Sequence, residues 1–334
     1  MKIISTAAVV RPVHVPKEQR KVVSVLLWLL VVPALVWLVL RVGGWERGLL
    51  VQLMAFTPYV ALWSLVPTVL AVGFRRWPTA AVAFAIVLAF AVLVMPRART
   101  SDQGPSQGVE LHVMTSNMRI GGADPATIVR LVRENKVDVL ALQEFSPSGR
   151  RGLEKNGLLE LLPYSSLGDE PGASGSGIYS RFPLTGAGDR RYGGGFRQAY
   201  GTIQPLGAGP VLFESVHPRA PVTLPENRLW QADLAEEPQP EADGPPRVLL
   251  GDFNATLDHR SMRKLVDAGY RDAGDATGTG LVTTWPYMEH RGVPKVTIDH
   301  VLVDRRIGVR QMSAHRIPNT DHRALIAVIT VPAA

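Results

Sequence analysis

Three long apolar segments fill the first third of the chain and limit what it can fold into. They cover residues 22–40, 49–74 and 79–95, and the first contains Ser24 as its only polar residue. Each is close to the roughly 20 residues that cross a hydrocarbon core. Buried core helices would explain one such segment better than three in succession, and a cleaved signal peptide would be shorter. We therefore predict that residues 1–98 form a membrane module with three transmembrane helices.

Lysines and arginines beside these segments predict the direction of insertion, because positive residues favour the cytoplasmic side. The segment before the first helix and the second loop hold seven, namely Lys2, Arg11, Lys17, Arg20, Lys21, Arg75 and Arg76. The opposite side holds four, namely Arg41, Arg47, Arg97 and Arg99. We predict a multi-pass protein of the cell membrane, with a cytoplasmic N-terminus and an extracellular C-terminal domain.

Charge is divided unevenly between the two parts of the chain. The formal net charge is +7, but residues 1–108 carry 11 Lys+Arg and 3 Asp+Glu, whereas residues 109–334 carry 25 and 26. The outer domain is therefore nearly neutral. A protein that binds DNA through its phosphates is expected to present a basic face, so a nucleic-acid partner is less favoured. The chain has no cysteine, which excludes disulfides and thiolate zinc sites.

The C-terminal part of the chain reads as a single α/β domain at 109–334. A linker is predicted at 99–108, where Gly, Ser and Pro gather. Beyond it, short apolar stretches such as 109–115 and 137–142 end in polar residues. Many short strands with few helices predict two packed sheets with helices outside them.

The stretch LLGDFNAT, residues 249–256, places an acceptor and an amide at the end of one predicted strand. In an extended chain, Asp252 and Asn254 would point the same way, because side chains two residues apart share a face. Gly251 would allow a sharp exit from the strand. Two interpretations stay open from these eight residues, an Asx-turn that closes the strand and a catalytic site.

Other predicted strands also end in polar residues, and a glycine-rich loop adds an arginine. The full set is Asn117, Glu144, Arg197, His217, Asp252, Asn254, Asp299, Asp321 and His322. A turn or a solvated strand end could explain each residue taken alone. Together they suit the hydrolysis of a phosphate ester.

Carboxylate and amide oxygens suit a hard divalent cation. We predict that Glu144 binds Mg²⁺, for which Mn²⁺ could substitute, with Asn117 and Asp321 beside it. The cation would polarise a phosphoryl oxygen. Arg197 could add a charge-assisted contact to the phosphate, although a solvated loop arginine is the simpler interpretation.

The remaining residues suit proton transfer and phosphate contact. Asp252 could accept the proton of an attacking water, and Asn254 could orient that water or the phosphoryl group. His322 could stabilise the pentacovalent state as a cation, with Asp299 holding its ring. His217 could be a second donor to phosphate.

The motifs SNMR, LQE, SGIYSRFPL, VHP, GDFN, TWP with IDHVLVD, and TDHRAL occur in this order from Val109 to Ala334. As a set, they resemble the endonuclease/exonuclease/phosphatase superfamily, which includes DNase I-like nucleases, inositol polyphosphate 5-phosphatases and neutral sphingomyelinases. The resemblance implies a four-layer αββα sandwich and a metal-dependent phosphoric ester hydrolase.

By this resemblance, the metal end of the site contains Asn117 and Glu144, with Asp321 nearby. The motifs place His217, Asp252 and Asn254 around the phosphate and the attacking water. Asp299 and His322 are expected to pair.

The substrate is left open by the superfamily. Its abasic-site endonuclease branch carries an aspartate where this chain has Arg119, which favours the DNase I-like and phosphatase-like branches. Three membrane helices before such a domain resemble membrane-bound actinobacterial proteins related to VanJ, which are associated with resistance to teicoplanin-type glycopeptides. We therefore expect a phosphate ester or pyrophosphate at the outer membrane face, in a lipid-linked envelope molecule. An extracellular metal-dependent nuclease is the alternative.

Overall fold

The computed structural model describes residues 17–288 and 292–334, so the basic residues Lys2 and Arg11 lie outside the described part. The chain divides into two compact units. One contains the chain up to Val39 together with Tyr59–Ala91, and the other contains Leu40–Pro58 together with Val92–Ala334. The second unit therefore includes residues from the predicted membrane module.

The first unit is built from apolar helices. They are α1 (Lys17–Gly43), which continues into the second unit, α3 (Thr57–Trp63), α4 (Leu65–Gly73) and α5 (Trp77–Val94). Small and apolar side chains of α1 and α5 form its core, including Val31, Ala34, Ala83 and Phe90. Two helical stretches are long and apolar enough to cross a membrane, Lys17–Gly43 and Trp77–Ala98. Only 17% and 33% of these windows are buried, so most of their apolar surface faces outward.

The predicted span 49–74 is wrong as one continuous helix. Its first turns form α2 (Leu50–Met54), which belongs to the second unit. The helix is interrupted after Met54, and the remaining apolar stretch, Thr57–Gly73, is shorter than the two helices of crossing length. The Thr57 hydroxyl donates to the Met54 carbonyl at 2.8 Å across this break. The described residues thus contain two helices of crossing length instead of three.

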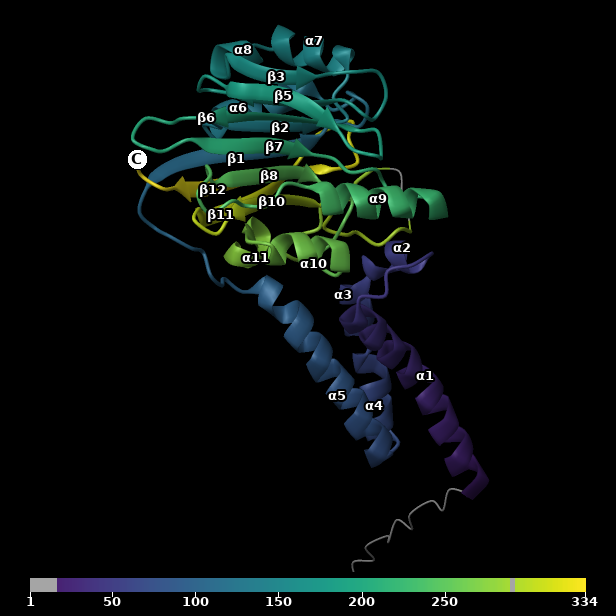
Figure 1. Cartoon of the computed structure of the whole chain (residues 1–334). Coiled ribbons are helices and arrows are strands. Elements are labelled where there is room, and N and C mark those ends of the chain that lie inside the picture. Colours follow the sequence, from purple (N-terminus) through teal and green to yellow (C-terminus); the bar gives the residue numbers. More distant parts are fainter. Residues whose placement is uncertain (1–16, 289–291) are drawn as a thin grey trace, which may run out of the picture. The chain divides into compact units, whose positions relative to one another are not determined.

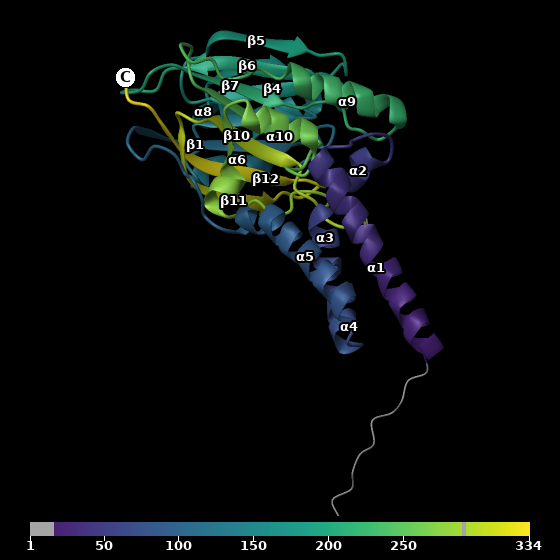
Figure 2. The same ribbon diagram turned by 60° about the horizontal axis from the view of Figure 1, so that its bottom comes forward.

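The second unit contains two six-stranded sheets (Figure 1). The first has the strand order β11 (Gly308–Arg316), β12 (Arg323–Val331), β1 (Val109–Asn117), β2 (Val139–Gln143), β4 (Ser176–Ser180) and β3 (Tyr164–Gly168). The second has the order β5 (Thr185–Arg191), β6 (Arg197–Ile203), β7 (Val211–Val216), β8 (Arg247–Asp252), β10 (Asp299–Asp304) and β9 (Tyr270–Asp272). Figure 2 shows β5, β6 and β7 running side by side.

Alternating side chains bury both faces of each sheet. In β1, Val113 packs between the sheets, whereas its neighbour Met114 packs outward. In β8, Val248 and Leu250 point between the sheets, and Leu249 points outward. This period of two is what a strand covered on both faces requires.

Helices cover the two outer faces. The first sheet is covered by α6 (Pro125–Glu134), α7 (Pro147–Lys155) and α8 (Leu158–Leu161). The second is covered by α9 (Leu224–Glu236) and α10 (Arg260–Asp267). The short α11 (Ala273–Thr277) packs on β10 and β11 and on the 3-10 turn η1 (Met95–Ala98). The predicted mixed α/β sandwich of two sheets with outer helices is confirmed.

Strand pairing brings the predicted polar residues to one edge. β1 runs parallel to β2, and β7 runs parallel to β8, so the carboxyl ends of each pair lie together. β12 is antiparallel to β1, and β10 is antiparallel to β8 with Asp299 opposite Asp252. The residues that follow β1, β2, β7 and β8 therefore meet those that begin β10 and precede β12.

A buried ion pair connects three distant segments of the second unit. Asp258, which is 1% exposed, accepts a hydrogen bond from Arg41 Nε at 2.9 Å. Its two oxygens also accept from Arg97 at 2.7 Å each. Burial would raise the pKa of Asp258, but the two arginines lower it below its ordinary value. The end of α1 and the turn after α5 are thereby attached to the loop between β8 and α10, which contains Asp258.

Replacing this aspartate should destabilise the larger unit. Asp258→Asn leaves two buried guanidinium groups without their charge partner, which typically costs about 3–5 kcal/mol. We expect a clear fall in the thermal midpoint of the full chain in detergent. Because the folded pKa is lowered, the ionic contribution is full above about pH 4 and is lost only as pH falls further. The exposed Asp267→Asn is the control, and equal midpoints for both variants would contradict this role.

Candidate active site

A pocket of about 500 Å³ opens where the strand ends meet. Six of the predicted residues line it, namely Glu144, His217, Asp252, Asn254, Asp321 and His322. Asn117 and Asp299 are buried behind them and bind lining residues directly. The structure thus gathers eight of the nine predicted residues. Their individual roles stay predictions.

Asp299 and His322 form a buried pair. His322 Nδ1 donates to Asp299 Oδ2 at 2.9 Å, and His322 Nε2 lies 3.6 Å from Asp252 Oδ2. Burial alone would lower the pKa of His322, but Asp299 and Asp252 raise it to about 10. Burial raises the pKa of Asp252, while His322 opposes that shift. The arrangement therefore holds an imidazolium beside a carboxylate that favours accepting a proton.

His217 is held in the opposite state. Its ring is 2% exposed and packs on Phe196, with the ring centroids 4.8 Å apart. Burial lowers the pKa of His217 to about 4, so the ring is neutral at physiological pH. Nε2 lies 3.8 Å from Asp252 Oδ2, and Nδ1 has no hydrogen-bond partner within the described residues. One neutral and one charged histidine thus flank the same carboxylate.

Asn117 bridges two carboxylates. Its Nδ2 donates to Glu144 Oε1 at 3.1 Å and to Asp252 Oδ2 at 3.0 Å. The amide oxygen accepts from the Arg119 backbone N–H at 2.9 Å. In this orientation Asn117 is a donor that holds Glu144 and Asp252 in place, and its predicted contact with a metal stays a prediction.

Glu144 adopts a backbone conformation that side chains rarely take. Its φ is +50°, in the left-handed region, which costs a non-glycine residue about 1–2 kcal/mol. Glu144 Oε2 accepts from the Ile120 N–H at 2.9 Å, and burial raises the pKa of the carboxyl. Such strain at a pocket-lining acid indicates a functional constraint on its direction.

The GDFN stretch forms the predicted Asx-turn, and its Asp252 and Asn254 both line the pocket. Asp252 ends β8, and its Oδ1 accepts from the Asn254 N–H at 2.9 Å, which is an Asx-turn. Asn254 has a φ of +49°, so it is not extended as the same-face prediction assumed. Its amide donates to the Pro218 carbonyl at 3.1 Å and still lines the pocket. The two interpretations of this stretch are therefore compatible.

Gly251 serves close strand packing and not a sharp exit. It lies inside β8, opposite Val216 of β7. A Cβ atom at this position would lie 2.0 Å from the Val216 carbonyl oxygen. Only glycine allows these two strands to approach so closely.

Three neighbouring motif residues position the strand ends. Gln143 Nε2 donates to Ser215 Oγ at 2.9 Å, which connects β2 of one sheet to β7 of the other. Thr284 Oγ1 accepts from the backbone N–H of Asp299 at 3.1 Å. Thr320 Oγ1 donates to the Asn117 carbonyl at 3.0 Å. These contacts explain why polar residues accompany the lining side chains in the LQE, TWP and TDHRAL motifs.

Two sets of oxygen and nitrogen donors could hold a cation. Glu144 and Asp321 line the pocket, and the charge of Asp321 contributes to the raised pKa of Glu144. Asp321 Oδ2 accepts from Trp285 Nε1 at 2.9 Å. A cation would offset the repulsion between the two carboxylates, and an all-oxygen set fits a hard divalent ion.

The second set is Asp252, Asp299 and His322, whose ligand atoms lie within 4.8 Å of one another. His322 already donates through Nδ1, and its raised pKa favours the protonated ring. Because Asp299 already engages Nδ1 of this ring, Glu144 and Asp321 stay the predicted ligands.

Arg197 is not brought to this group. It begins β6, and its guanidinium pairs with Glu170 at 3.0 Å and with Asp189. It does not line the pocket. Two carboxylates already satisfy its charge, which is why the loop arginine predicted to contact phosphate faces elsewhere.

Other lining residues were not predicted from the sequence. Arg119 and Trp285 line the pocket and lie inside the quoted SNMR and TWP motifs, which could have indicated them. Val51, Ala55 and Phe56 come from the apolar run 49–74. The polar Gln52 in that run was the available signal that this part is not a simple membrane helix.

The sequence model of the Endonuclease/Exonuclease/phosphatase family matches residues 114–322, which is more than half of the chain. The chain belongs to this family. Its members are generally hydrolases of phosphate esters, and they generally depend on a divalent metal. A comparison with curated protein sequences found no match.

Solved structures share the fold at low sequence identity. An endonuclease/exonuclease/phosphatase from Beutenbergia cavernae has a TM-score of 0.53 at 17% identity, over 67% of this chain and 72% of that one. Sphingomyelinase C from Streptomyces griseocarneus gives 0.51 at 16%, over 66% and 99%. TDP2 from D. rerio, complexed with single strand DNA product, gives 0.53 at 14%, over 66% and 99%. These similarities agree with the two-sheet sandwich.

The Asp299–His322 pair should set the alkaline limit of hydrolytic activity. In Asp299→Asn, burial still lowers the pKa of His322, and only the charges of Asp252 and Asp321 are left to oppose it. The imidazolium should then lose its proton at lower pH. We expect the alkaline limb of the kcat/KM profile to move down by at least about one pH unit. Asp304→Asn, at the other end of β10, should leave the limb in place, and an unchanged limb in Asp299→Asn would reject the pairing role.

Proposed function

We propose that the protein is a membrane-anchored, Mg²⁺-dependent phosphoesterase that acts at the outer face of the cell membrane. The observation that carries the proposal is the pocket lined by Glu144, Asp252 and His322. The chain belongs to a family whose members generally hydrolyse phosphate esters. The substrate would be a phosphate ester or pyrophosphate of a lipid-linked envelope molecule.

The chain's own residues supply proton transfer and charge. Asp252 would accept the proton of an attacking water, since its raised pKa makes it a better base than an ordinary aspartate. His322, held as a cation by Asp299, would stabilise the negative charge that develops on the phosphoryl oxygens. Neutral His217 and the amide of Asn254 would orient the phosphate.

A divalent cation at Glu144 and Asp321 fits the donor set described above. When bound, it would polarise a phosphoryl oxygen and offset its developing charge. Mg²⁺ is the proposed ion because it prefers a few carboxylates together with waters and substrate oxygens.

The membrane arrangement is part of the proposal. Lys17–Gly43 and Trp77–Ala98 would span the bilayer, and Thr57–Gly73 would form a shorter middle crossing. The excess of basic residues before α1 and between α4 and α5 favours a cytoplasmic N-terminus, and the catalytic domain would then lie outside. An envelope substrate would connect this activity with glycopeptide resistance.

A nuclease is the second candidate, because TDP2 with bound single-stranded DNA product shares the fold. The near-neutral outer domain argues against it. Degradation of plasmid DNA with a steep dependence on salt, and no turnover of lipid phosphates, would favour the nuclease over the proposed activity.

Turnover should require both the metal and Asp252. We expect the purified full chain to hydrolyse phosphate esters with Mg²⁺ and to lose this activity in EDTA. Asp252→Asn should lower kcat by about 10²–10⁴-fold, the usual contribution of a general base. Glu144→Gln should raise the Mg²⁺ concentration needed for half-maximal rate. The control is Asp243→Asn in an exposed loop, and full activity of Asp252→Asn would overturn the mechanism.

The topology can be measured independently of activity. A phosphatase reporter fused after Ala334 should be active only if the C-terminus lies outside the cytoplasm. We expect an active phosphatase reporter there. A reporter that works only in the cytoplasm should be inactive when it is fused at the same position. The reverse pattern would mean that the basic residues do not determine the orientation.

A further inference from the structure

The helix α2 contributes to the same pocket as the catalytic residues. Val51, Gln52, Ala55 and Phe56 line it together with Asp252 and His322. These four residues precede the family-matched region by more than 50 positions. The catalytic pocket is therefore incomplete without a segment that lies between two apolar helices in the sequence.

Hydrogen bonds from α9 and its preceding loop fix this segment in place. Gln52 Nε2 donates to the Pro221 carbonyl at 2.6 Å and to Asn227 Oδ1 at 3.1 Å. Asn227 Nδ2 in turn donates to the Gly48 carbonyl at 2.8 Å. Figures 1 and 2 both show α2 beside α9. Side chains of the catalytic domain thus satisfy backbone groups of the segment, as in a single folded unit.

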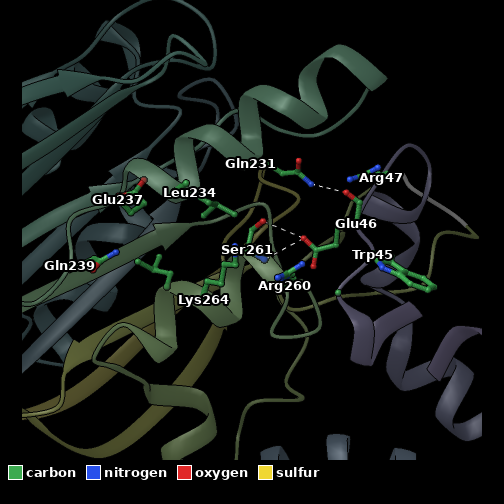
Figure 3. Close-up of a pocket in the computed structure, with 13 residues that line it drawn as sticks. Trp45, Glu46, Arg47, Gln231, Leu234, Glu237, Gln239, Arg260, Ser261 and Lys264 are labelled. Carbon is green, nitrogen blue, oxygen red and sulfur yellow. Dashed lines mark hydrogen bonds between the residues drawn. The ribbon is translucent and has the colours of Figure 1, made fainter. Parts of the chain in front are cut away.

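A second set of contacts lies at a hollow of about 460 Å³ before α2 (Figure 3). Gln231 Nε2 donates to the Glu46 carbonyl at 2.8 Å. The Glu46 carboxylate accepts from the Ser261 hydroxyl and backbone N–H, both at 3.3 Å. Residues 46–52 are therefore held by α9 and α10 along their whole length.

His259 connects α2 to the loop that follows GDFN. The Thr256 N–H donates to His259 Nδ1 at 2.9 Å, so the proton of the neutral ring is on Nε2. Nε2 donates to the Val51 carbonyl at 2.7 Å. The position of α2 is thereby tied to the loop that follows Asp252.

The upper walls of the pocket are apolar. α2 supplies Val51, the two residues that follow the helix supply Ala55 and Phe56, and the loop bound by Gln52 adds Pro221 and Val222. Val222 is 74% exposed, so protein does not cover the rim of this wall. A small, water-soluble phosphate ester would gain little from such a surface, whereas an aliphatic chain would be removed from water on it.

We infer that α2 and the two residues after it form a binding wall for an aliphatic chain whose phosphate group lies at Asp252 and His322. This inference rests on the proposed function and specifies its substrate class as a phosphorylated amphiphile. Ala55 and Phe56, which are half-buried and line the pocket, are specificity residues that contact the chain. Gln52 and His259 are positioning residues that hold the wall against the catalytic loop.

The experiment compares substrates that differ only in chain length. The full-length protein is assayed with Mg²⁺ on octyl and methyl 4-nitrophenyl phosphate, and on octyl and methyl phosphate, below the concentrations at which they aggregate. These pairs cover diesterase and monoesterase action. We expect the wild type to prefer the octyl member of at least one pair by about tenfold or more in kcat/KM.

Ala55→Gln and Ala55→Leu test the wall with side chains of similar size. The glutamine puts a polar group where the chain should lie, so the ratio of octyl to methyl kcat/KM should fall about tenfold. The leucine should keep the preference. Leu53→Gln, on α2 but outside the pocket lining, is the matched control and should behave like the wild type.

The outcomes separate the inference from the proposed function. Metal-dependent turnover with equal rates for octyl and methyl members would overturn the wall and leave the phosphoesterase standing. Turnover of none of the four probes would count against the phosphoesterase. In that case, the affinities for octylphosphonate and methylphosphonate are measured, because they report the chain preference without turnover. Equal affinities would reject the binding wall.

Discussion

The site depends on an excess of negative charge, because carboxylates outnumber cationic side chains at one edge of the sandwich. Asp252, Asp299 and Glu144 lie near a single imidazolium, that of His322. His322 keeps its proton because two of these carboxylates surround it, and Asp252 gains basicity because it is buried. Arg119 Nε lies 3.9 Å from Asp321 Oδ1, and a divalent cation would balance the negative charge that remains near Glu144 and Asp321. The chemistry follows from this charge imbalance more than from any one residue.

Topology explains why the sequence indicated most of this group. Each residue ends or precedes an apolar strand, and the apolar stretches 109–115 and 137–142 identified β1 and β2. Asp124 caps the start of α6, where its side chain accepts from the Thr127 N–H at 2.8 Å. By contrast, α9 was missed, although Thr223 and Glu226 form a capping box that its sequence already displays. Local sequence patterns were thus enough to indicate these strands and the capped helices, although one capping box was not used.

Long-range pairing accounts for what the sequence could not provide. Arg197 looked like a phosphate ligand because nothing local shows that Glu170 and Asp189 neutralise it. Asn254 was expected to extend the strand, but its bond to Asp252 turns the backbone. The run 49–74 was read as one membrane helix because hydropathy does not show that Gln52 binds Pro221 and Asn227. In each case, the deciding partner is distant in sequence or depends on backbone geometry.

The Asp258 ion pair has a consequence for how this architecture can be inherited. Its arginine partners come from the end of α1 and from η1, both of which precede the family domain in the sequence. A gene fusion that joined residues 109–334 to a different N-terminal segment would separate a buried carboxylate from both of its counter-ions. The N-terminal segment and the family domain are therefore not interchangeable modules joined at the linker. The smallest portable segment begins before Arg41, so the two parts are expected to diverge together.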